Sequence, residues 1–346
     1  MRWAVVLAGG VGSRFWPVST AARPKQLLPL AGDKPLIAES VERVLPLLPA
    51  SRVLVVTSRA LGPAIRLALP DVPAENVLTE PFAASTAPAL AWATALAARQ
   101  DPDAVVLSLH ADWTVRDAQA FRAAASAALD LAAAQDVLVT VGARPTRPEI
   151  GYGYIVPGEP IAGGPARTIA RFVEKPTPER AAAMIAEGAA WNTGLFAWTA
   201  RRFRAEVETH TPELATALPA LDGGDAEAFY RGVTPVSVDV GVFERTRRGA
   251  TLSGDFGWDD VGSWAALARV RAADAAGNVT AGSAHAVDSR DSVLWADEGT
   301  VVTFGVEGLV VVRTGGITLV TTRERAASLK ALLGQLPADL AGDRGV

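Results

Sequence analysis

The sequence contains no cysteine, which excludes disulfide bonds and thiolate chemistry. It also has no apolar run near the roughly 20 residues that a membrane-spanning helix requires, and no export signal is recognisable at its start. Long basic runs are absent and the formal net charge is −4, so the electrostatic footprint of a nucleic-acid-binding protein is missing. We therefore expect a cytoplasmic globular protein that binds neither nucleic acid nor membrane.

Lysine is scarce as well, since it occurs only at positions 25, 34, 175 and 330 while arginine supplies nearly all other positive charge. Lys25 and Lys175 lie within motifs described below, whereas the other two are interpreted as surface residues. The chain has 346 residues, of which 49% are hydrophobic, so one large domain and a smaller one are expected. We predict a catalytic domain over residues 1–273 and a small β-rich domain over 274–346, where valine, threonine and regularly placed glycine dominate.

The first half alternates apolar runs with stretches of helical length, which predicts an α/β fold with a mostly parallel sheet. Strands are expected at residues 3–7, 52–57, 104–109 and 137–142, with alanine-rich helices at 88–99 and 118–134. Beyond residue 151 shorter strands are expected at 167–173, 193–198 and 236–240, with helices at 178–187 and 322–333. Ligands of such sheets bind beyond the carboxyl ends of the strands.

The segment after the first strand predicts a phosphate-binding loop. Gly9, Gly10 and Gly12 allow the backbone to approach an anion closely, while Arg14 and Lys25 add full positive charges. The third glycine of a dinucleotide-binding fingerprint is missing, and no Gly-Lys-Ser/Thr triplet exists anywhere, so a Walker A loop is excluded. An ordinary glycine turn is the competing interpretation for the three glycines alone.

The glycine loop, together with the further segments given below, resembles the sequence motifs of the sugar nucleotidyltransferases. Within that family the resemblance is to the mannose-1-phosphate guanylyltransferases. The resemblance extends over nearly the whole chain. It is carried by segments 7–30, 80–90, 109–113, 172–176, 191–196 and 257–264.

The resemblance implies a Rossmann-like nucleotidyltransferase domain followed by a short β-helix-like appendage. It also implies transfer of GMP from GTP to mannose 1-phosphate, which yields GDP-mannose and pyrophosphate without a covalent intermediate. Such chemistry needs cations around crowded anions and a divalent metal with oxygen ligands, for which Mg²⁺ is the natural choice. A homodimer is compatible with the β-rich region, although the sequence defines no interface.

The family's functional residues transfer to positions whose surrounding motifs match. The expected catalytic residues are Arg14, Lys25 and Lys175, and the expected metal ligands are Asp112 and Asp260. The expected nucleotide-binding residues are Leu7, Ala8, Gly9, Gly10, Gly12, Ser13, Glu80, Pro81, Thr86 and Ala87. The expected sugar-phosphate residues are Gly151, Glu174, Lys175, Asn192, Gly194 and Asp239.

Guanine presents adjacent N–H donors that a carboxylate can accept, so Glu80, or backbone groups near Pro81, is the expected base reader. A surface ion pair is the alternative for Glu174 and Lys175, and a plain β-turn is the alternative for residues 191–194.

The sequence departs from the family pattern at two places. Ala84-Ser85 stands where the guanylyl branch has Arg-Asn, and Trp113 replaces the histidine that follows the metal-binding aspartate. We assign a structural role to His110, because no neighbouring residue in the sequence completes an acid–base pair. Another sugar 1-phosphate or nucleotide, or a non-catalytic sugar-nucleotide-binding regulatory protein with the same fold, remains an alternative.

Overall fold

The computed structural model describes residues 1–10, 13–161, 163–337 and 340, and these residues form two compact units. The large unit comprises Met1–Gly9, Ser40–His110 and Asp117–Trp258. The small unit comprises Gly10–Glu39, Ala111–Arg116 and Asp259–Val346. Each unit is therefore assembled from three separate stretches of chain, and each is described on its own below.

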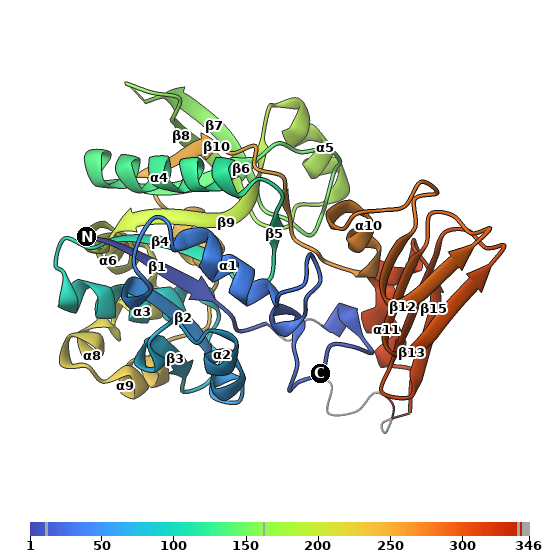
Figure 1. Ribbon diagram of the computed structural model, residues 1–346. Coiled ribbons are helices and arrows are strands. Elements are labelled where there is room, and N and C mark those ends of the chain that lie inside the picture. Colours follow the sequence, from blue (N-terminus) through green and yellow to red (C-terminus); the bar gives the residue numbers. More distant parts are fainter. Residues whose placement is uncertain (11–12, 162, 338–339, 341–346) are drawn as a thin grey trace. The chain divides into compact units, whose positions relative to one another are not determined.

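The large unit is built on a nine-stranded sheet of order β3-β2-β1-β4-β9-β6-β10-β8-β7 (Figure 1). Its strands are β1 (Arg2–Leu7), β2 (Val53–Ser58), β3 (Val77–Glu80), β4 (Val105–His110), β6 (Leu138–Ala143), β7 (Tyr154–Pro160), β8 (Arg167–Val173), β9 (Ala190–Thr199) and β10 (Gly249–Ser253). Pairs β1–β2, β2–β3, β1–β4 and β6–β10 are parallel, whereas β8 and β9 run against their neighbours. The predicted α/β fold with a mostly parallel sheet is confirmed.

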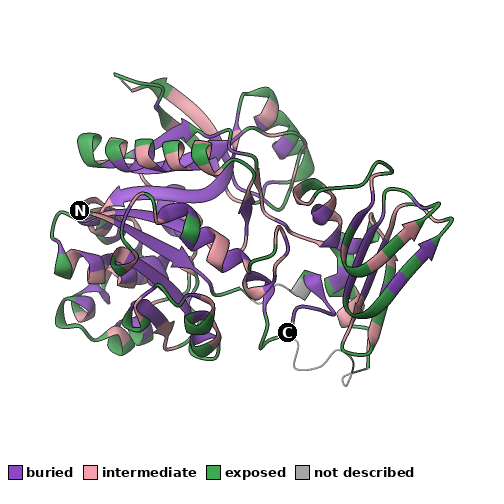
Figure 2. Cartoon of the chain, in the orientation of Figure 1, coloured by how far each residue is buried: buried purple, intermediate pink, exposed green. Residues whose placement is uncertain are grey.

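The central strands are mostly apolar because helices cover both of their faces. Residues 3–8, which span β1 and the position after it, are all buried, as the purple strands of Figure 2 show. The helices of this unit are α2 (Gly62–Ala68), α3 (Thr86–Gln100), α4 (Ala118–Gln135), α5 (Pro178–Ala186), α6 (Ala200–His210), α7 (Pro212–Ala215), α8 (Leu218–Gly223) and α9 (Ala226–Gly232), with 3-10 turns η3 (Ala50–Arg52) and η4 (Ala74–Asn76). Helix α1 (Leu36–Val44) begins in the small unit and ends in the large one.

The register of the sheet places four strand ends at one edge. Leu7 of β1 is opposite both Val56 of β2 and His110 of β4, and Ser58 of β2 is opposite Glu80 of β3. Because parallel strands share a direction, their carboxyl ends meet there, which is where open sheets bind ligands.

The predicted strand at residues 236–240 is wrong. The segment enters a π-helical turn, η5 (Asp239–Phe243), in which the Gly241 N–H donates to the Ser237 carbonyl. Valines favour strands locally, but here the Val238 N–H donates to the Thr86 hydroxyl instead of a sheet neighbour. A tertiary contact has thus overridden local propensity.

The small unit contains the four-stranded sheet β12-β13-β14-β15, formed by β12 (Val279–Val287), β13 (Val293–Phe304), β14 (Leu309–Thr314) and β15 (Ile317–Thr322). The first three strands pair in parallel and β15 returns antiparallel to β14. The expected β-helix-like C-terminal region is confirmed. The helix expected at 322–333 is shorter, because a 3-10 turn, η7 (Arg325–Ser328), precedes α11 (Leu329–Leu333).

Aromatic side chains link this sheet to the loops of the small unit. Trp264 lies edge-on against both Phe15 and Trp295, and its indole N–H donates to the Trp16 carbonyl at 2.9 Å. The loops are shaped by the short turns η1 (Ser13–Phe15), η2 (Lys25–Leu27) and η6 (Trp264–Ala266) and by α10 (Leu267–Val270). Strands β5 (Thr114–Val115) and β11 (Trp258–Asp259) are only two residues long. Within the described residues, no helix is long and apolar enough to cross a membrane.

Candidate active site

A cavity of about 280 Å³ in the small unit brings together three distant parts of the sequence. It is lined by Arg14, Phe15, Lys25, Asp112, Trp113, Asp260 and Gly262. Lys25 is only 7% exposed, and its Nζ donates to the Asp260 carbonyl at 2.6 Å and to Asp112 Oδ2 at 3.2 Å. The predicted cations and metal-binding carboxylates of this unit therefore share one cavity.

The local backbone explains how Asp260 reaches this cavity. A Cβ on Gly262 would lie 2.5 Å from Asp260 Oδ2, so a side chain at this position would displace the carboxylate, and Arg14 Nη1 lies 3.5 Å from the same point. Val261 has a φ of +47°, and its N–H donates to Asp259 Oδ1 at 2.8 Å. Asp259 also binds the Arg269 guanidinium through both carboxylate oxygens. The two adjacent aspartates thus have different surroundings.

The donor set of the cavity suits a hard divalent cation. Mg²⁺ commonly takes one or two protein carboxylates and completes its shell with water and phosphate oxygens, and Asp112 and Asp260 supply two carboxylates. No cluster of three or more His, Cys, Asp or Glu residues able to hold a metal occurs in the described part of the chain. Arg14 and Lys25 would complement the negative charge of a phosphate ligand in the same cavity.

The remaining residues of the predicted glycine loop are distributed as follows. Leu7, Ala8 and Gly9 belong to the large unit, and Gly10 begins the small one. Ser13 is the first residue of η1, and Gly12 lies outside the described residues.

The edge formed by β1, β2 and β3 holds the predicted base-binding residues of the large unit. The Ala8 N–H donates to the Val56 carbonyl, and the Ala8 carbonyl accepts from the Thr57 hydroxyl, so the end of β1 is fixed. A Cβ on Gly9 would lie 3.8 Å from Glu80 Oε2, which places this glycine beside the carboxylate. Pro81 follows Glu80 directly at the end of β3.

The Glu80 carboxylate is half-buried and accepts a hydrogen bond from the Tyr230 hydroxyl. Burial raises the pKa of Glu80 to about 7, and the hydrogen bond from the Tyr230 hydroxyl to Oε1, at 3.0 Å, opposes this shift. Near neutral pH this group therefore exists in both protonation states. Tyr230 was not among the residues that the motifs identified, since it lies 150 positions after Glu80.

Thr86 and Ala87 hold another segment of the large unit in place. The Thr86 hydroxyl accepts from the Val238 N–H at 2.8 Å, and the Ala87 N–H donates to the Val236 carbonyl at 3.1 Å. Ala87 itself is fully buried. The first turn of α3 thereby positions the chain that leads into Asp239.

Four of the predicted sugar-phosphate residues form a polar cluster at the middle of the sheet. Asn192 donates from Nδ2 to Asp239 Oδ1 at 2.8 Å, and its Oδ1 accepts from the Thr140 hydroxyl and the Gly194 N–H. Glu174 reaches the same place, because a Cβ on Gly153 would lie 2.6 Å from Glu174 Oε2 and 3.1 Å from the Asn192 Cβ.

His110 and Gly153 complete this cluster, although the sequence motifs did not assign either residue to it. A Cβ on Gly194, whose φ is +72°, would lie 2.8 Å from the His110 ring, so a larger residue would displace the imidazole. The signal for His110 was its place at the carboxyl end of β4, next to the other strand ends.

The electrostatics of the cluster centre on Asp239. Burial and the nearby Glu174 carboxylate raise the pKa of Asp239 to about 6, while His110 and the hydrogen bond from Asn192 act in the opposite direction. Acceptors and donors are thus packed side by side in a form that suits the hydroxyl groups of a sugar.

Lys175 and Gly151 lie towards solvent. Lys175 Nζ is 2.9 Å from Glu174 Oε1, but its side chain is 65% exposed, and the residue has a φ of +47°. Its N–H donates to the Tyr152 carbonyl. Gly151 is exposed and its N–H donates to Glu149 Oε1. The exposed ammonium group of Lys175 can therefore contact an anion. The Gly151 N–H, by contrast, is used in a hydrogen bond within its own loop.

Comparison with known proteins finds relatives over nearly the full sequence. Residues 3–277 match the family described as Nucleotidyl transferase, and residues 282–336 match the MannoseP isomerase/GMP-like beta-helix domain. The mannose-1-phosphate guanylyltransferase of Escherichia coli K12 is 38% identical over 97% of this chain and 74% of its own length. ManC of Salmonella typhimurium LT2 is 36% identical over 97% of this chain and 73% of its own length.

A solved structure is similar in three dimensions as well. The crystal structure described as mannose-1-phosphate geranyltransferase from Thermus thermophilus superimposes with a TM-score of 0.90 at 36% identity. The match covers 97% of this chain and 99% of that chain.

Proposed function

This chain belongs to the mannose-1-phosphate guanylyltransferases of the nucleotidyl transferase family, and from that premise we propose that it transfers GMP from GTP to mannose 1-phosphate. The products are GDP-mannose and pyrophosphate. The observation that carries the proposal is the cavity in which Arg14, Lys25, Asp112 and Asp260 gather from three distant segments. Phosphoryl chemistry needs such an arrangement because several anionic oxygens must be neutralised together.

The reaction is a single displacement at phosphorus. A phosphate oxygen of mannose 1-phosphate attacks the α-phosphorus of GTP and forms one new P–O bond. The bond from the α-phosphorus to the bridging oxygen breaks, and pyrophosphate leaves with that electron pair. No protein nucleophile is required, so the side chains act by positioning the reactants and by offsetting charge.

The small unit supplies the charges for this step. Lys25, held by the Asp260 carbonyl and by Asp112, would direct its ammonium group at the triphosphate, and Arg14 would add a planar pair of donors. Nucleotidyl transferases use a divalent metal ion, for which we propose Mg²⁺, with Asp112 and Asp260 as its protein ligands. The bound ion would withdraw charge from the triphosphate oxygens.

The large unit supplies recognition of the sugar and the base. Asn192, Asp239 and Glu174 would accept and donate hydrogen bonds to mannose hydroxyls, and Lys175 would hold the sugar phosphate. Glu80 would accept from the Watson–Crick edge of guanine, with the Gly9 backbone alongside. We further propose residues 1–273 as the nucleotidyltransferase domain, a cytoplasmic location, and a homodimer as the assembled form.

The test is a pyrophosphate-release assay with GTP and mannose 1-phosphate, run with Mg²⁺ and with excess chelator. We expect release that depends on both substrates and stops when the metal is removed. A panel of four nucleoside triphosphates against several sugar 1-phosphates decides the specificity. A higher kcat/KM with another pair would replace the proposed substrates. If no pair gave pyrophosphate, a non-catalytic sugar-nucleotide-binding role would be favoured instead.

A further inference from the structure

The two oxygens of the Glu80 carboxylate have different environments. Oε1 accepts a hydrogen bond from the Tyr230 hydroxyl at 3.0 Å. Oε2 points towards Gly9, where a Cβ would lie at 3.8 Å. Because Gly9 has no side chain and is exposed, the Oε2 side of the carboxylate is the side that a ligand beside Gly9 can approach.

Tyr230 is itself fixed by aromatic packing. Its side chain is fully buried, and its ring lies edge-on to Trp92 of α3 at 5.7 Å and to Phe82 at 5.8 Å. Phe229 packs against it in the same manner at 5.6 Å. Aromatic neighbours on several sides leave the phenol ring little freedom, so the position of its hydroxyl is defined before any ligand binds.

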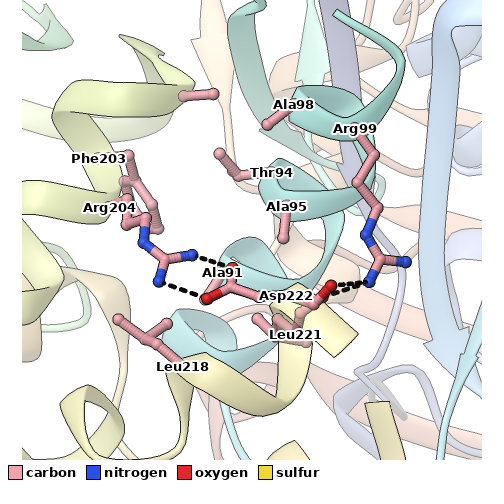
Figure 3. Close-up of a pocket in the computed structure, with 11 residues that line it drawn as sticks. Ala91, Thr94, Ala95, Ala98, Arg99, Phe203, Arg204, Leu218, Leu221 and Asp222 are labelled. Atoms are coloured by element: carbon pink, nitrogen blue, oxygen red, sulfur yellow. Dashed lines mark hydrogen bonds and ion pairs between the residues drawn. The ribbon is translucent and has the colours of Figure 1, made fainter. Parts of the chain in front are cut away.

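The helices that carry Tyr230 are fastened to the rest of the large unit. Asp225 caps the N-terminus of α9, and its carboxylate accepts from the Ala228 N–H at 2.8 Å. The preceding helix α8 closes one side of a cavity of about 250 Å³ that it shares with α3 and α6 (Figure 3).

Two arginines at this cavity hold the end of α8. Arg204 of α6 binds both carboxylate oxygens of Asp222, and Arg99 of α3 donates to the Leu221 and Asp222 carbonyls, as the dashed lines of Figure 3 show. These contacts hold α8, the helix that precedes the Tyr230 helix in the chain, against α3 and α6. Helix α3 also follows the strand of Glu80 in the chain, and its Trp92 packs against Tyr230. Both partners of the Glu80–Tyr230 hydrogen bond are therefore connected to α3.

Guanine places an N1–H and an exocyclic amine side by side, and a carboxylate recognises this pair only when it is ionised and held in one orientation. Burial opposes the ionised form of Glu80, whereas the hydroxyl of Tyr230 favours it. We propose that Tyr230 is a positioning residue for base recognition, whose hydroxyl holds the Glu80 carboxylate as an oriented acceptor for guanine. This inference rests on the proposed function, because the role of Glu80 is part of it.

The experiment compares the full-length protein with Tyr230→Phe, which keeps the ring and removes only the hydroxyl. Binding of GTP and of inosine triphosphate, which lacks the exocyclic amine, is measured calorimetrically without sugar phosphate. We expect GTP binding to weaken about tenfold and the preference for GTP over inosine triphosphate to fall towards one. In turnover assays KM for GTP should rise by a similar factor, while KM for mannose 1-phosphate and kcat stay within about twofold.

Tyr154→Phe is the matched control for loss of a buried phenol hydroxyl. Tyr154 is also fully buried, and its hydroxyl donates to the Glu149 carbonyl at 3.0 Å. We expect this variant to keep the preference for GTP over inosine triphosphate. The double variant Glu80→Gln/Tyr230→Phe should bind GTP no more weakly than Glu80→Gln alone, because Tyr230 acts through Glu80.

The outcomes separate the inference from the proposed reaction. Tyr230→Phe with unchanged nucleotide preference, or with equal losses for both substrates, overturns the inference and leaves a purely structural role for the hydroxyl. A protein that does not prefer guanine at all overturns it too. Guanine-selective binding without pyrophosphate release refutes the proposed reaction, while the comparison of GTP binding by the two Tyr→Phe variants still decides the role of Tyr230.

Discussion

The two candidate sites, one in each unit, differ in how their polar groups are held. In the small unit, full charges line an open cavity, and Lys25 lies between an aspartate carboxylate and a backbone carbonyl. In the large unit, the Asn192 amide and the Asp239 and Glu80 carboxylates are held by partly buried side-chain hydrogen bonds. Full charges around a cavity suit phosphates and metal ions, whereas hydrogen-bonded donors and acceptors suit hydroxyl groups and base edges.

The comparison predicts that the small unit governs the rate of the reaction and that the large unit governs substrate recognition. Changes in the small unit should lower kcat and alter the metal requirement, because they remove charge stabilisation from the reacting phosphates. Changes in the large unit should raise KM for one substrate and leave the other substrate unaffected.

The largest effect is expected for Lys25→Ala. Removing a buried cation aimed at the triphosphate should lower kcat by about 10³-fold, as loss of one electrostatic stabiliser commonly does. Steady-state kinetics at saturating GTP and mannose 1-phosphate would measure it. Lys330→Ala is the control, because Lys330 is an exposed lysine of α11 in the same unit. A kcat within about threefold of the unchanged protein would remove Lys25 from the reaction.

Asp260→Asn tests the metal site and should lower kcat by about 10²-fold while raising the Mg²⁺ concentration needed for half-maximal rate. Its adjacent residue provides the control. Asp259→Asn breaks the ion pair with Arg269 but can still accept from the Val261 N–H, so its metal requirement should not change. Equal metal titration curves for the two variants would contradict the assignment of Asp260.

Part of this arrangement was predictable from the sequence. The buried first strand, the α3 and α4 helices and the joint cavity of Arg14, Lys25, Asp112 and Asp260 follow motifs whose residues are close in sequence to strand ends or glycines. Segment 236–240 was assigned wrongly, because its valines favour a strand while Thr86 binds its backbone from 152 positions away.

The residues that the motifs did not identify share this long-range character. Tyr230 matters through a contact with Glu80, and His110 through its position against Gly194. The position of β9 between β4 and β6 likewise depends on tertiary packing, because local periodicity does not determine the order of strands in a sheet. Local patterns therefore predicted which residue types matter, and the fold determined their partners.

Asp239→Asn tests recognition of the sugar in the large unit. The substitution keeps the shape of the side chain but removes the acceptor charge that faces the Asn192 amide. We expect KM for mannose 1-phosphate to rise about 30-fold with KM for GTP unchanged. Asp130→Asn, which loses an ion pair with Arg2 elsewhere in this unit, is the control. A parallel rise of KM for GTP would mean that the two recognition sites are not independent.

The smallest effect is a pH dependence set by Glu80. Its pKa in the folded protein is about 7, above its ordinary value of 4.5, so the folded state binds the extra proton between these values. Guanine recognition needs the ionised carboxylate, so kcat/KM for GTP should increase about tenfold from pH 6 to pH 8 at saturating mannose 1-phosphate. Glu80→Gln should lower this constant and flatten its profile.

Stability should change with pH in the opposite direction. Because the raised pKa makes the folded state hold the proton more tightly, the free energy of unfolding decreases as pH rises from about 4.5 to about 7 and then levels off. Denaturant titrations of Glu80→Gln should lack this contribution. If the kinetic profile stayed steep in Glu80→Gln, another group would control it, and the assignment of base recognition to the large unit would lose its main support.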